Sequence, residues 1–170
     1  MFKNQNKKEI IFDNDSLKEA VKDWINDSSN SRKKYGHIST WDVSQVTNME
    51  DLFCDAESFN EDISKWDVSN VEDMNNIFYN AKSFNQDIGD WDVSKVKNMW
   101  NAFCFAESFN QDIGNWDVSQ VENMEAMFSV AKNFNKNIGN WNVSNVSNMS
   151  SMFLDTDKFN HAGWQSHPRL

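Results

Sequence analysis

The chain has 170 residues, enough for one ordinary domain with a continuous core, and its formal net charge is −10. This acidity argues against binding nucleic acid through phosphates, because that mode needs clustered Lys and Arg side chains. No stretch approaches the ~20 consecutive apolar residues of a transmembrane helix. Thirteen Phe, eight Trp and eight Met replace a conventional aliphatic core, so we expect a folded chain with an aromatic interior.

Residues 1–40 precede the regular part of the sequence and are predicted to form an N-terminal cap. Apolar residues at helical spacing, with the capping-box spacing of Ser16 and Glu19, predict a helix over about 16–26, after a candidate strand at 9–12. The apolar run at the N-terminus is far shorter than the hydrophobic region of a signal peptide. We therefore expect a helix that covers the first repeat, and no export signal in this chain.

A 25-residue repeat occupies residues 41–165 in five copies, and residues 166–170 form a C-terminal tail. From its Trp, each copy reads W-D/N-V-S-x-V-x-N/D-M-x-x-h-F-x-x-A/T-x-x-F-N-x-x-I, where h is small or apolar, and the last copy departs from this pattern after Asn160. The copies begin at Trp41, Trp66, Trp91, Trp116 and Trp141. A fixed period of this length is typical of stacked repeats, in which each copy folds against its neighbours.

Each copy divides into two halves of different character. In the first copy, the residues at i, i+3, i+4 and i+7 are Met49, Leu52, Phe53 and Ala56. This spacing predicts a short helix, and the preceding Asn48 is a candidate cap. The other half, such as residues 59–71, is extended in character and predicts a short strand with flanking turns. We therefore predict an α/β solenoid of five strand-turn-helix repeats, with each Trp, Phe and Met lying on its equivalent in the next copy.

The segments WDVSQVTNMEDLF, WDVSNVEDMNNIF and FNQDIGNWDVS resemble the 25-residue bacterial surface-protein repeat of mycoplasma and Listeria lipoproteins, the DUF285 group of BspA-like leucine-rich-repeat proteins. The likeness covers residues 41 to about 160, and the lead-in LKEAVKDWI is similar to the usual N-terminal cap of that family. The resemblance implies a leucine-rich-repeat-like solenoid and a role at the cell surface in adhesion or host contact, without catalytic residues. No signal peptide or lipobox is found in the chain, so a cytoplasmic location stays open beside a cell-surface or secreted one.

Polar residues recur in columns along the predicted stack. One column contains Asp42, Asp67, Asp92 and Asp117, and another contains Asp62, Asp87 and Asp112. Because Ca²⁺ takes oxygen ligands, Asp62, Asp87 and Asp112 are candidate metal ligands. We favour the alternative that each Asp accepts a backbone N–H group within its own turn. The recurring Asn and Ser columns, which begin at Asn60 and Ser44, are interpreted as internal hydrogen-bond ladders.

Function in repeat proteins usually lies where the copies differ, and one such place is the predicted helix. Trp100 is a large aromatic residue in a polar column, and the same flank would hold Cys54, Tyr79 and Cys104, with Phe105 on the opposite flank. Clustered exposed aromatic residues can mark a binding surface. The candidate partner-binding residues are therefore Trp100, Tyr79, Cys104 and Phe105. Burial of these flanks against a neighbouring chain or loop is the alternative.

The cysteines and the short motifs of the sequence give no indication of a catalytic site. Cys54 and Cys104 lie two copies apart, roughly 9.5 Å at strand spacing, beyond the ~7 Å limit for a disulfide between their Cα atoms, so we predict free thiols. No metal-ligand spacing, phosphate loop or nucleophile elbow is present, and nothing places a base beside a nucleophile. The sequence therefore favours a non-enzymatic, cofactor-free protein-interaction or adhesion module. A Ca²⁺-dependent binding module and a cytoplasmic inhibitor or immunity-type protein are the alternatives. The expected partner is a protein or host surface component, with self-association through an uncapped last copy as a further option.

Overall fold

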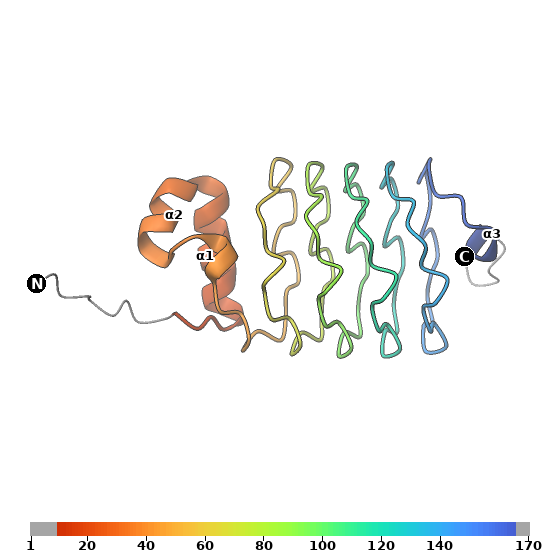
Figure 1. Cartoon of the computed structure of the whole chain (residues 1–170), viewed down its shortest axis with the longest axis horizontal. Helices are drawn as coiled ribbons and strands as arrows, with labels where there is room; N and C mark the ends of the chain where they lie inside the picture. Colours follow the sequence, from red (N-terminus) through yellow and green to blue (C-terminus); the bar gives the residue numbers. More distant parts are fainter. Residues whose placement is uncertain (1–9, 166–170) are drawn as a thin grey trace, which may run out of the picture.

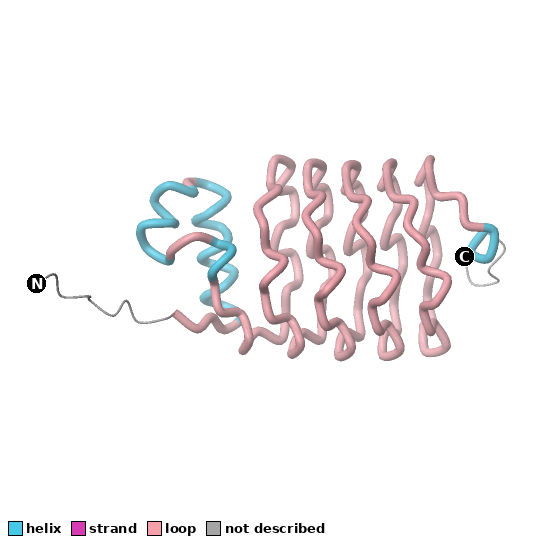
Figure 2. The backbone as a smooth tube through the Cα atoms, in the orientation of Figure 1, coloured by secondary structure: helices cyan, strands magenta, loops and turns pink. Residues whose placement is uncertain are grey.

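The computed structural model describes residues 10–165, so Glu9 of the candidate strand and the tail 166–170 lie outside the described residues. The helices are α1 (Asn14–Asn26), α2 (Ser28–Tyr35), the 3₁₀ turn η1 (Ile38–Thr40) and α3 (Ala162–Gln165). Figure 1 shows the five copies side by side along the long axis, with α1 and α2 at the N-terminal end and α3 at the other end. Between these ends the chain consists of loops and turns (Figure 2).

The predicted α/β leucine-rich-repeat-like solenoid of strand-turn-helix repeats is wrong. Between residues 41 and 161, all of which the structure describes, the chain forms neither a strand nor a helix. Successive copies are joined by isolated parallel bridges at one repeat position: Asn48 to Asp73, Asp73 to Asn98, Asn98 to Asn123 and Asn123 to Asn148. A further bridge joins Ile11 to Asp42. The candidate strand at 9–12 is therefore reduced, within its described part, to this one paired residue.

The segment predicted as a helix is a run of tight turns. Leu52 N–H donates to Met49 O at 3.2 Å and Ala56 N–H donates to Phe53 O at 3.1 Å, so these bonds span three residues and not the four of an α-helix. The N–H groups of Met49, Asp51 and Phe53 instead donate to carbonyls of the second copy at 2.9 to 3.0 Å. Because alternate N–H groups bond to the next copy, no helix continues through the segment. Because the intervening residues fold back, no extended strand forms either.

The hydrogen bonds between the turns of successive copies run in one direction, whereas other inter-copy bonds, such as Glu72 N–H to Thr47 O, run in the opposite one. At repeat positions 9, 11, 13 and 15, counted from each Trp, the N–H group of one copy donates to a carbonyl of the following copy, at all four interfaces. In the first copy these donors are Met49, Asp51, Phe53 and Asp55. The same four bonds thus recur at every step of the stack and hold all the copies in one register.

The backbone dihedrals explain why the helix prediction failed. Within residues 10–165, ten residues other than glycine have a positive φ, two in each copy. In the first copy they are Asp51, with a φ of 59°, and Asp55, with a φ of 60°. A positive φ at the third residue is the mark of a type II turn, and Asn and Asp tolerate this conformation better than most residues. The apolar spacing reported which side chains point inward, but not where the backbone reverses.

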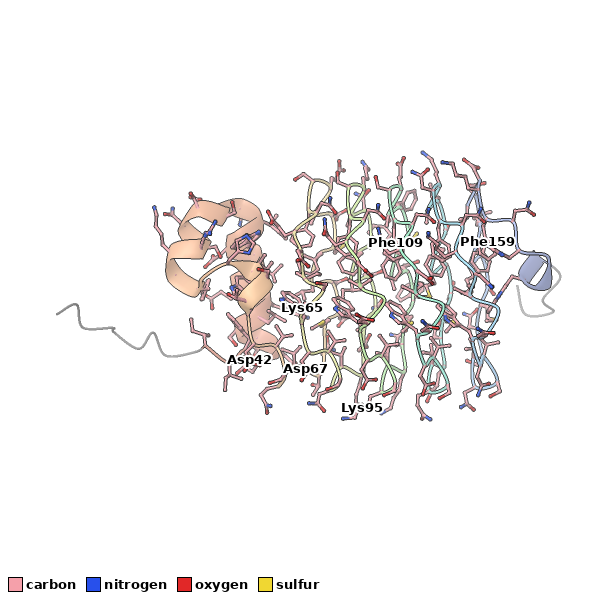
Figure 3. All side chains as sticks on the ribbon, viewed as in Figure 1. Asp42, Lys65, Asp67, Lys95, Phe109 and Phe159 are labelled. Carbon is pink, nitrogen blue, oxygen red and sulfur yellow. The ribbon has the colours of Figure 1, made fainter. Side chains whose placement is uncertain are left out.

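Aromatic rings stack on equivalent rings of the next copy, as predicted. One column contains Phe53, Phe78, Phe103, Phe128 and Phe153, with centroid separations of 5.4 to 5.9 Å. A second column contains Phe59, Phe84, Phe109, Phe134 and Phe159, with separations of 5.9 to 6.0 Å. Figure 3 labels Phe109 and Phe159 of this second column, which lie in the third and fifth copies at a similar height in the view. The core is therefore continuous from one end of the repeat array to the other.

The Trp side chains add a polar contact to this core. Each of four Trp residues donates its indole N–H to the carbonyl of an Ile 28 positions earlier. The pairs are Trp66 to Ile38, Trp91 to Ile63, Trp116 to Ile88 and Trp141 to Ile113, at 2.9 to 3.2 Å. A buried indole N–H needs such a partner. This bond explains why the repeat carries Trp, and not Phe, at its first position.

The N-terminal cap replaces a preceding copy. Helix α1 begins after Asp13, which forms a capping box with Ser16, three residues before the pair that the sequence indicated. Its apolar face is buried and carries Leu17, Ala20, Val21 and Trp24. Asn14 Oδ1 accepts the N–H groups of Thr47 at 2.9 Å and Asn48 at 3.2 Å. The cap therefore covers the first copy with apolar side chains and satisfies two of its backbone donors.

Within residues 10–165, the aromatic side chain of Trp164 covers the last copy. Trp164 of α3 packs edge-on against Trp141, with ring centroids 6.3 Å apart, and against Phe153, with centroids 5.9 Å apart. Trp164 is itself buried. Although the sequence places Trp164 two residues out of register with the other Trp residues, this shift lets the ring turn onto the end of the stack and cover the last aromatic residues.

Candidate functional site

The run of tight turns leaves four positions of each copy on the outside. In the first copy the buried residues are Met49, Leu52, Phe53 and Ala56, and the outer ones are Glu50, Asp51, Cys54 and Asp55. We call the surface formed by these four outer positions in all five copies the turn face. All the candidate partner-binding residues predicted from the sequence belong to the turn face.

The structure brings two of these candidates into contact. Trp100 is 40% exposed and Phe105 is 36% exposed, whereas Tyr79 is half-buried and Cys104 is buried. The rings of Tyr79 and Phe105 meet edge to face, with centroids 5.7 Å apart. Phe105 therefore packs against Tyr79 instead of lying on the opposite flank. Within residues 10–165, no aromatic ring packs against that of Trp100.

The pKa values of both cysteines of the turn face are raised. Both are free thiols, as predicted. Burial, and then the negative charges of Asp55 and Asp51, raise the pKa of Cys54 to about 11. Burial likewise raises the pKa of Cys104 to about 11. Because the thiolate is the nucleophile and the metal-binding form, neither side chain is activated at neutral pH, and Cys104 contributes packing to the turn face.

Three apolar residues of the turn face, Phe105, Ala126 and Val130, have a strained backbone with a positive φ. Phe105 and Val130 each have a φ of 59°, at a position where three other copies hold Asp55, Asn80 and Asp155. The left-handed conformation costs roughly 1–2 kcal/mol for residues other than Gly, with Asn and Asp the usual exceptions. The chain therefore accepts strain in two adjacent copies where apolar side chains occupy the outer side, and strain of this kind gathers at functional sites.

Val130→Asn should stabilise the protein by about 1 kcal/mol, because Asn relieves the strain of the left-handed backbone. The reverse change at the equivalent position, Asn80→Val, should destabilise it by at least as much, since it also removes the hydrogen bond from Asn80 Nδ2 to Asp55 at 2.8 Å. Urea unfolding followed by Trp fluorescence measures both. A lower stability of Val130→Asn would mean that the valine packs more favourably than its backbone strain costs.

The aspartate columns close local turns. In the candidate metal column, Asp62 accepts Ser64 N–H, Asp87 accepts Gly89 N–H and Asp112 accepts Gly114 N–H, at 2.9 to 3.1 Å. The column that begins with Asp42 and Asp67, both labelled in Figure 3, makes the same bond to the Ser two residues later. These contacts confirm the interpretation as turns. In the described part of the chain, no group of three His, Cys, Asp or Glu side chains lies close enough to hold a metal ion.

The same hydrogen bonds favour the charged form of the carboxyl groups. The pKa values of Asp62, Asp92 and Asp117 lie below the usual range. The main cause is the hydrogen bond from the hydroxyl of the serine two residues later, and the second cause is the hydrogen bond from the backbone N–H of that serine. The recurring serines thus donate within their own turns and form no ladder. The asparagine column does form the predicted ladder, because each side-chain Oδ1, beginning with Asn60, accepts the N–H of the equivalent Asn in the next copy at 2.9 to 3.2 Å.

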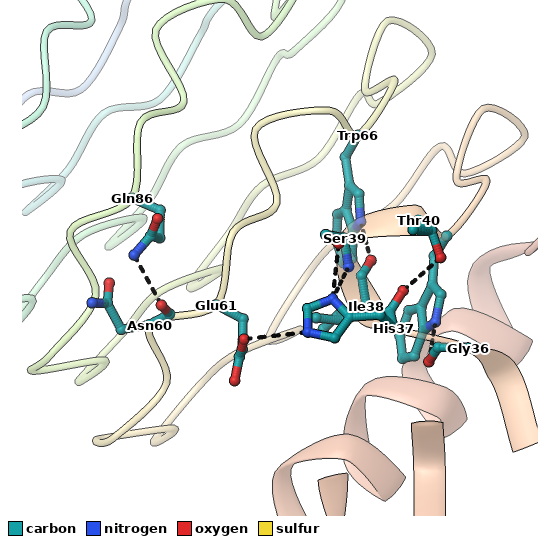
Figure 4. A network of polar contacts seen from close by, with 10 residues as sticks. Gly36, His37, Ile38, Ser39, Thr40, Asn60, Glu61, Trp66 and Gln86 are labelled. Carbon is teal, nitrogen blue, oxygen red and sulfur yellow. Dashed lines mark hydrogen bonds and ion pairs between the residues drawn. The ribbon is translucent and has the colours of Figure 1, made fainter. Parts of the chain in front are cut away.

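A base and a hydroxyl lie together where the cap meets the first copy (Figure 4). His37 Nδ1 is 2.8 Å from Ser39 Oγ, and His37 Nε2 is 3.8 Å from Glu61 Oε2. This pair could not be predicted from the residue spacing, because the 3₁₀ turn η1 creates it. The same Nδ1 accepts the Ser39 backbone N–H at 3.3 Å, so His37 is the N-cap of η1. The contact therefore closes the turn that leads into Trp41.

Comparison with known families identifies the repeat. The family described as "Mycoplasma protein of unknown function, DUF285" matches residues 2–112 and, a second time, residues 86–167. The chain belongs to the DUF285 family. This confirms the resemblance drawn from the repeat motifs, and the family description assigns no activity. Neither the curated proteins nor the solved structures include a significant match to this DUF285 chain. Among residues 10–165, none of the helices has the length and apolar character needed to cross a membrane.

In this DUF285 chain a hollow of about 350 Å³ lies between one side of α1 and the outer side of the first copy. Its walls are Lys18, Lys22, Ile25 and Asn26 of α1, and Glu50, Asp51, Leu52 and Cys54 of the first copy. The hollow therefore borders the turn face at its N-terminal end. In the first copy, the carbonyls of Glu50, Leu52 and Cys54 accept no backbone N–H group from the described residues. In each later copy, the equivalent carbonyls accept N–H groups from the preceding copy.

Proposed function

We propose that this DUF285 chain is a non-catalytic module that binds a protein partner through the turn face. The observation that carries the proposal is the exposure of Trp100 and Phe105, at 40% and 36%, in a stack whose two phenylalanine columns are largely buried. Large aromatic side chains are enriched among the residues that dominate binding energy. The strained backbone of Phe105 supports the proposal, because the chain accepts a cost to hold this ring on the outer side.

The proposed setting is the bacterial cell surface, with a role in adhesion or host contact, as the resemblance to surface-protein repeats implies. The partner is then a protein or another component of a host surface. Self-association through the last copy belongs to the same proposal, and the exposed Leu154, at 54%, lies on the turn face of that copy. The rigid register of the stack supports this function, since it presents the turn-face side chains on a fixed scaffold.

Substitution of the exposed rings tests the proposal. We expect Trp100→Ala and Phe105→Ala each to weaken binding to host cells, or to the extracellular-matrix protein that the chain binds, by about tenfold or more. Flow cytometry of labelled protein and biolayer interferometry on a panel of purified matrix proteins measure this loss. The control is Ile11→Ala, which removes an apolar side chain that is 59% exposed but outside the turn face, and it should bind normally.

Thermal melting separates binding from folding in these variants. Melting temperatures close to that of the unmodified chain are expected for all three, because none of the residues is buried. Binding that both aromatic substitutions leave unchanged would contradict the proposed surface. A large loss of stability would instead make Trp100 and Phe105 structural residues.

A further inference from the structure

The turn face is negatively charged around its aromatic centre. Its twenty positions contain no Lys or Arg but five carboxylates: Glu50, Asp51, Asp55, Glu125 and Asp155. Within residues 10–165 none of the five forms an ion pair; four of them accept hydrogen bonds from Asn side chains instead. Nearby lysines are already paired, Lys82 with Glu57 at 2.8 Å and Lys132 with Glu107 at 2.9 Å. Two further lysines, Lys18 and Lys22, line the hollow beside α1 together with Glu50 and Asp51 of the first copy.

Three residues of one column lie side by side on this face. Asn75, Trp100 and Glu125 occupy the same repeat position in successive copies. The inter-copy bonds keep them adjacent, because Asn76 N–H donates to Trp100 O and Asn101 N–H donates to Glu125 O, both at 2.9 Å. An exposed indole ring is therefore flanked by a carboxylate on one side and an amide on the other.

Both flanking side chains have an unused acceptor. Glu125 Oε2 accepts from Asn148 Nδ2 at 2.7 Å, and its Oε1 accepts nothing within the described residues. Asn75 is 7% exposed, and its Nδ2 donates to Glu50 at 3.1 Å. Its buried Oδ1 has no hydrogen-bond partner among the described residues, which is costly in a folded protein. Within residues 10–165, the column thus combines an open aromatic face with a carboxylate whose Oε1 is unpaired and a buried amide oxygen that is also unpaired.

The geometry points to a subsite for an arginine side chain, and we propose that the protein partner supplies it. A guanidinium group has five donors and no acceptor, stacks on aromatic rings and pairs with carboxylates. A lysine ammonium group is more strongly hydrated and cannot stack in this way. The inference rests on the proposed function and specifies its partner: a basic segment whose arginine lies on Trp100, with apolar residues on Tyr79 and Phe105.

A small probe tests the subsite without the partner. N-acetyl-arginine methylamide is titrated into the ¹⁵N-labelled full chain, and the indole N–H signal of Trp100 is followed after assignment with Trp100→Phe. We expect a saturable shift with this probe and little shift with the citrulline analogue, which has the same shape without the charge. The lysine analogue should bind about two- to fivefold more weakly, because it loses stacking on the ring.

A matched pair of variants tests the carboxylate. Glu125→Gln should weaken binding of the arginine probe by about two- to fivefold. Glu122→Gln removes the same charge from the same copy, but at a position outside the turn face, so it should leave the titration unchanged. An equal effect of both variants would mean that the general acidity of the protein, and not the subsite, attracts the probe.

The outcomes separate this inference from the proposed function. If the citrulline analogue shifts Trp100 as much as the arginine probe, or if neither shifts it, the arginine subsite is wrong. In either case the proposed function stands as long as Trp100→Ala and Phe105→Ala still lose partner binding. If those variants keep their binding, the proposed function fails whatever the titration gives.

Discussion

Phe103→Ala is expected to destabilise the protein by about 3–5 kcal/mol, the range for truncating a fully buried Phe. Phe103 is 2% exposed, and its ring lies 4.2 Å from that of Phe109, 5.4 Å from Phe78 and 5.6 Å from Phe128. The loss would create a cavity where the two phenylalanine columns meet. The neighbouring rings cannot close this cavity easily, because inter-copy hydrogen bonds fix the spacing of the backbone on both sides.

The control for this prediction is Phe105→Ala, two residues later in the same copy. Phe105 is 36% exposed and has one ring contact, with Tyr79, so its truncation should cost less than about 1.5 kcal/mol. Chemical denaturation followed by Trp fluorescence gives both free energies of unfolding. Equal costs for the two substitutions would contradict the aromatic stack as the main source of stability.

Trp116→Phe should also be destabilising, although it conserves an aromatic ring. The change removes the indole N–H that donates to Ile88 O at 3.1 Å. That carbonyl keeps the backbone N–H of Trp91 as a donor at 3.1 Å, so the lost hydrogen bond itself costs about 0.5–1.5 kcal/mol. The smaller ring also gives up contact with Trp141, on which Trp116 stacks with centroids 6.4 Å apart and an interplanar angle of 3°.

Trp100→Phe is the matched control, since it is the same chemical change at a side chain that is 40% exposed. The indole N–H of Trp100 bonds to no described residue, so this variant should stay within about 0.5 kcal/mol of the unmodified protein. Differential scanning calorimetry compares the two without relying on Trp emission. If Trp116→Phe melts like Trp100→Phe, the indole-to-carbonyl bonds do not stabilise the stack.

The contacts between copies could be predicted because the repeat itself specifies them. When the same side chain recurs every 25 residues, stacking places it on its own equivalent. The phenylalanine columns and the Asn60 ladder follow directly from this rule. The turns closed by Asp42 and Asp62 were also accessible, because Asp followed by a small residue commonly accepts an N–H group two residues later. These predictions depend on residue identity and period, and not on the path of the backbone.

The backbone path and the site could not be predicted in the same way. Met49, Leu52, Phe53 and Ala56 point inward as they would from a helix, so the apolar spacing alone does not separate a helix from successive turns. The overlooked signal was Asp or Asn at the equivalents of Asp51 and Asp55 in most copies, since these residues favour a positive φ. The contact between Tyr79 and Phe105 depends on side-chain directions set by those turns, and the prediction of opposite flanks assumed a helix.

The hydrogen bonds at repeat positions 9, 11, 13 and 15 give the turns of the stack two unlike ends, one of donors and one of acceptors. On this side of the stack, the last copy ends in backbone donors, Met149, Ser151, Phe153 and Asp155, and no carbonyl within residues 10–165 accepts them. At the other end, the first copy presents the carbonyls of Glu50, Leu52 and Cys54, which no described N–H group reaches, beside the hollow that α1 borders. Two first copies, or two last copies, cannot form hydrogen bonds with each other through these groups, because acceptors would face acceptors or donors would face donors. Through these groups, two copies of the described stack could therefore pair only head to tail, and α1 lies over the carbonyls that the donors would have to reach.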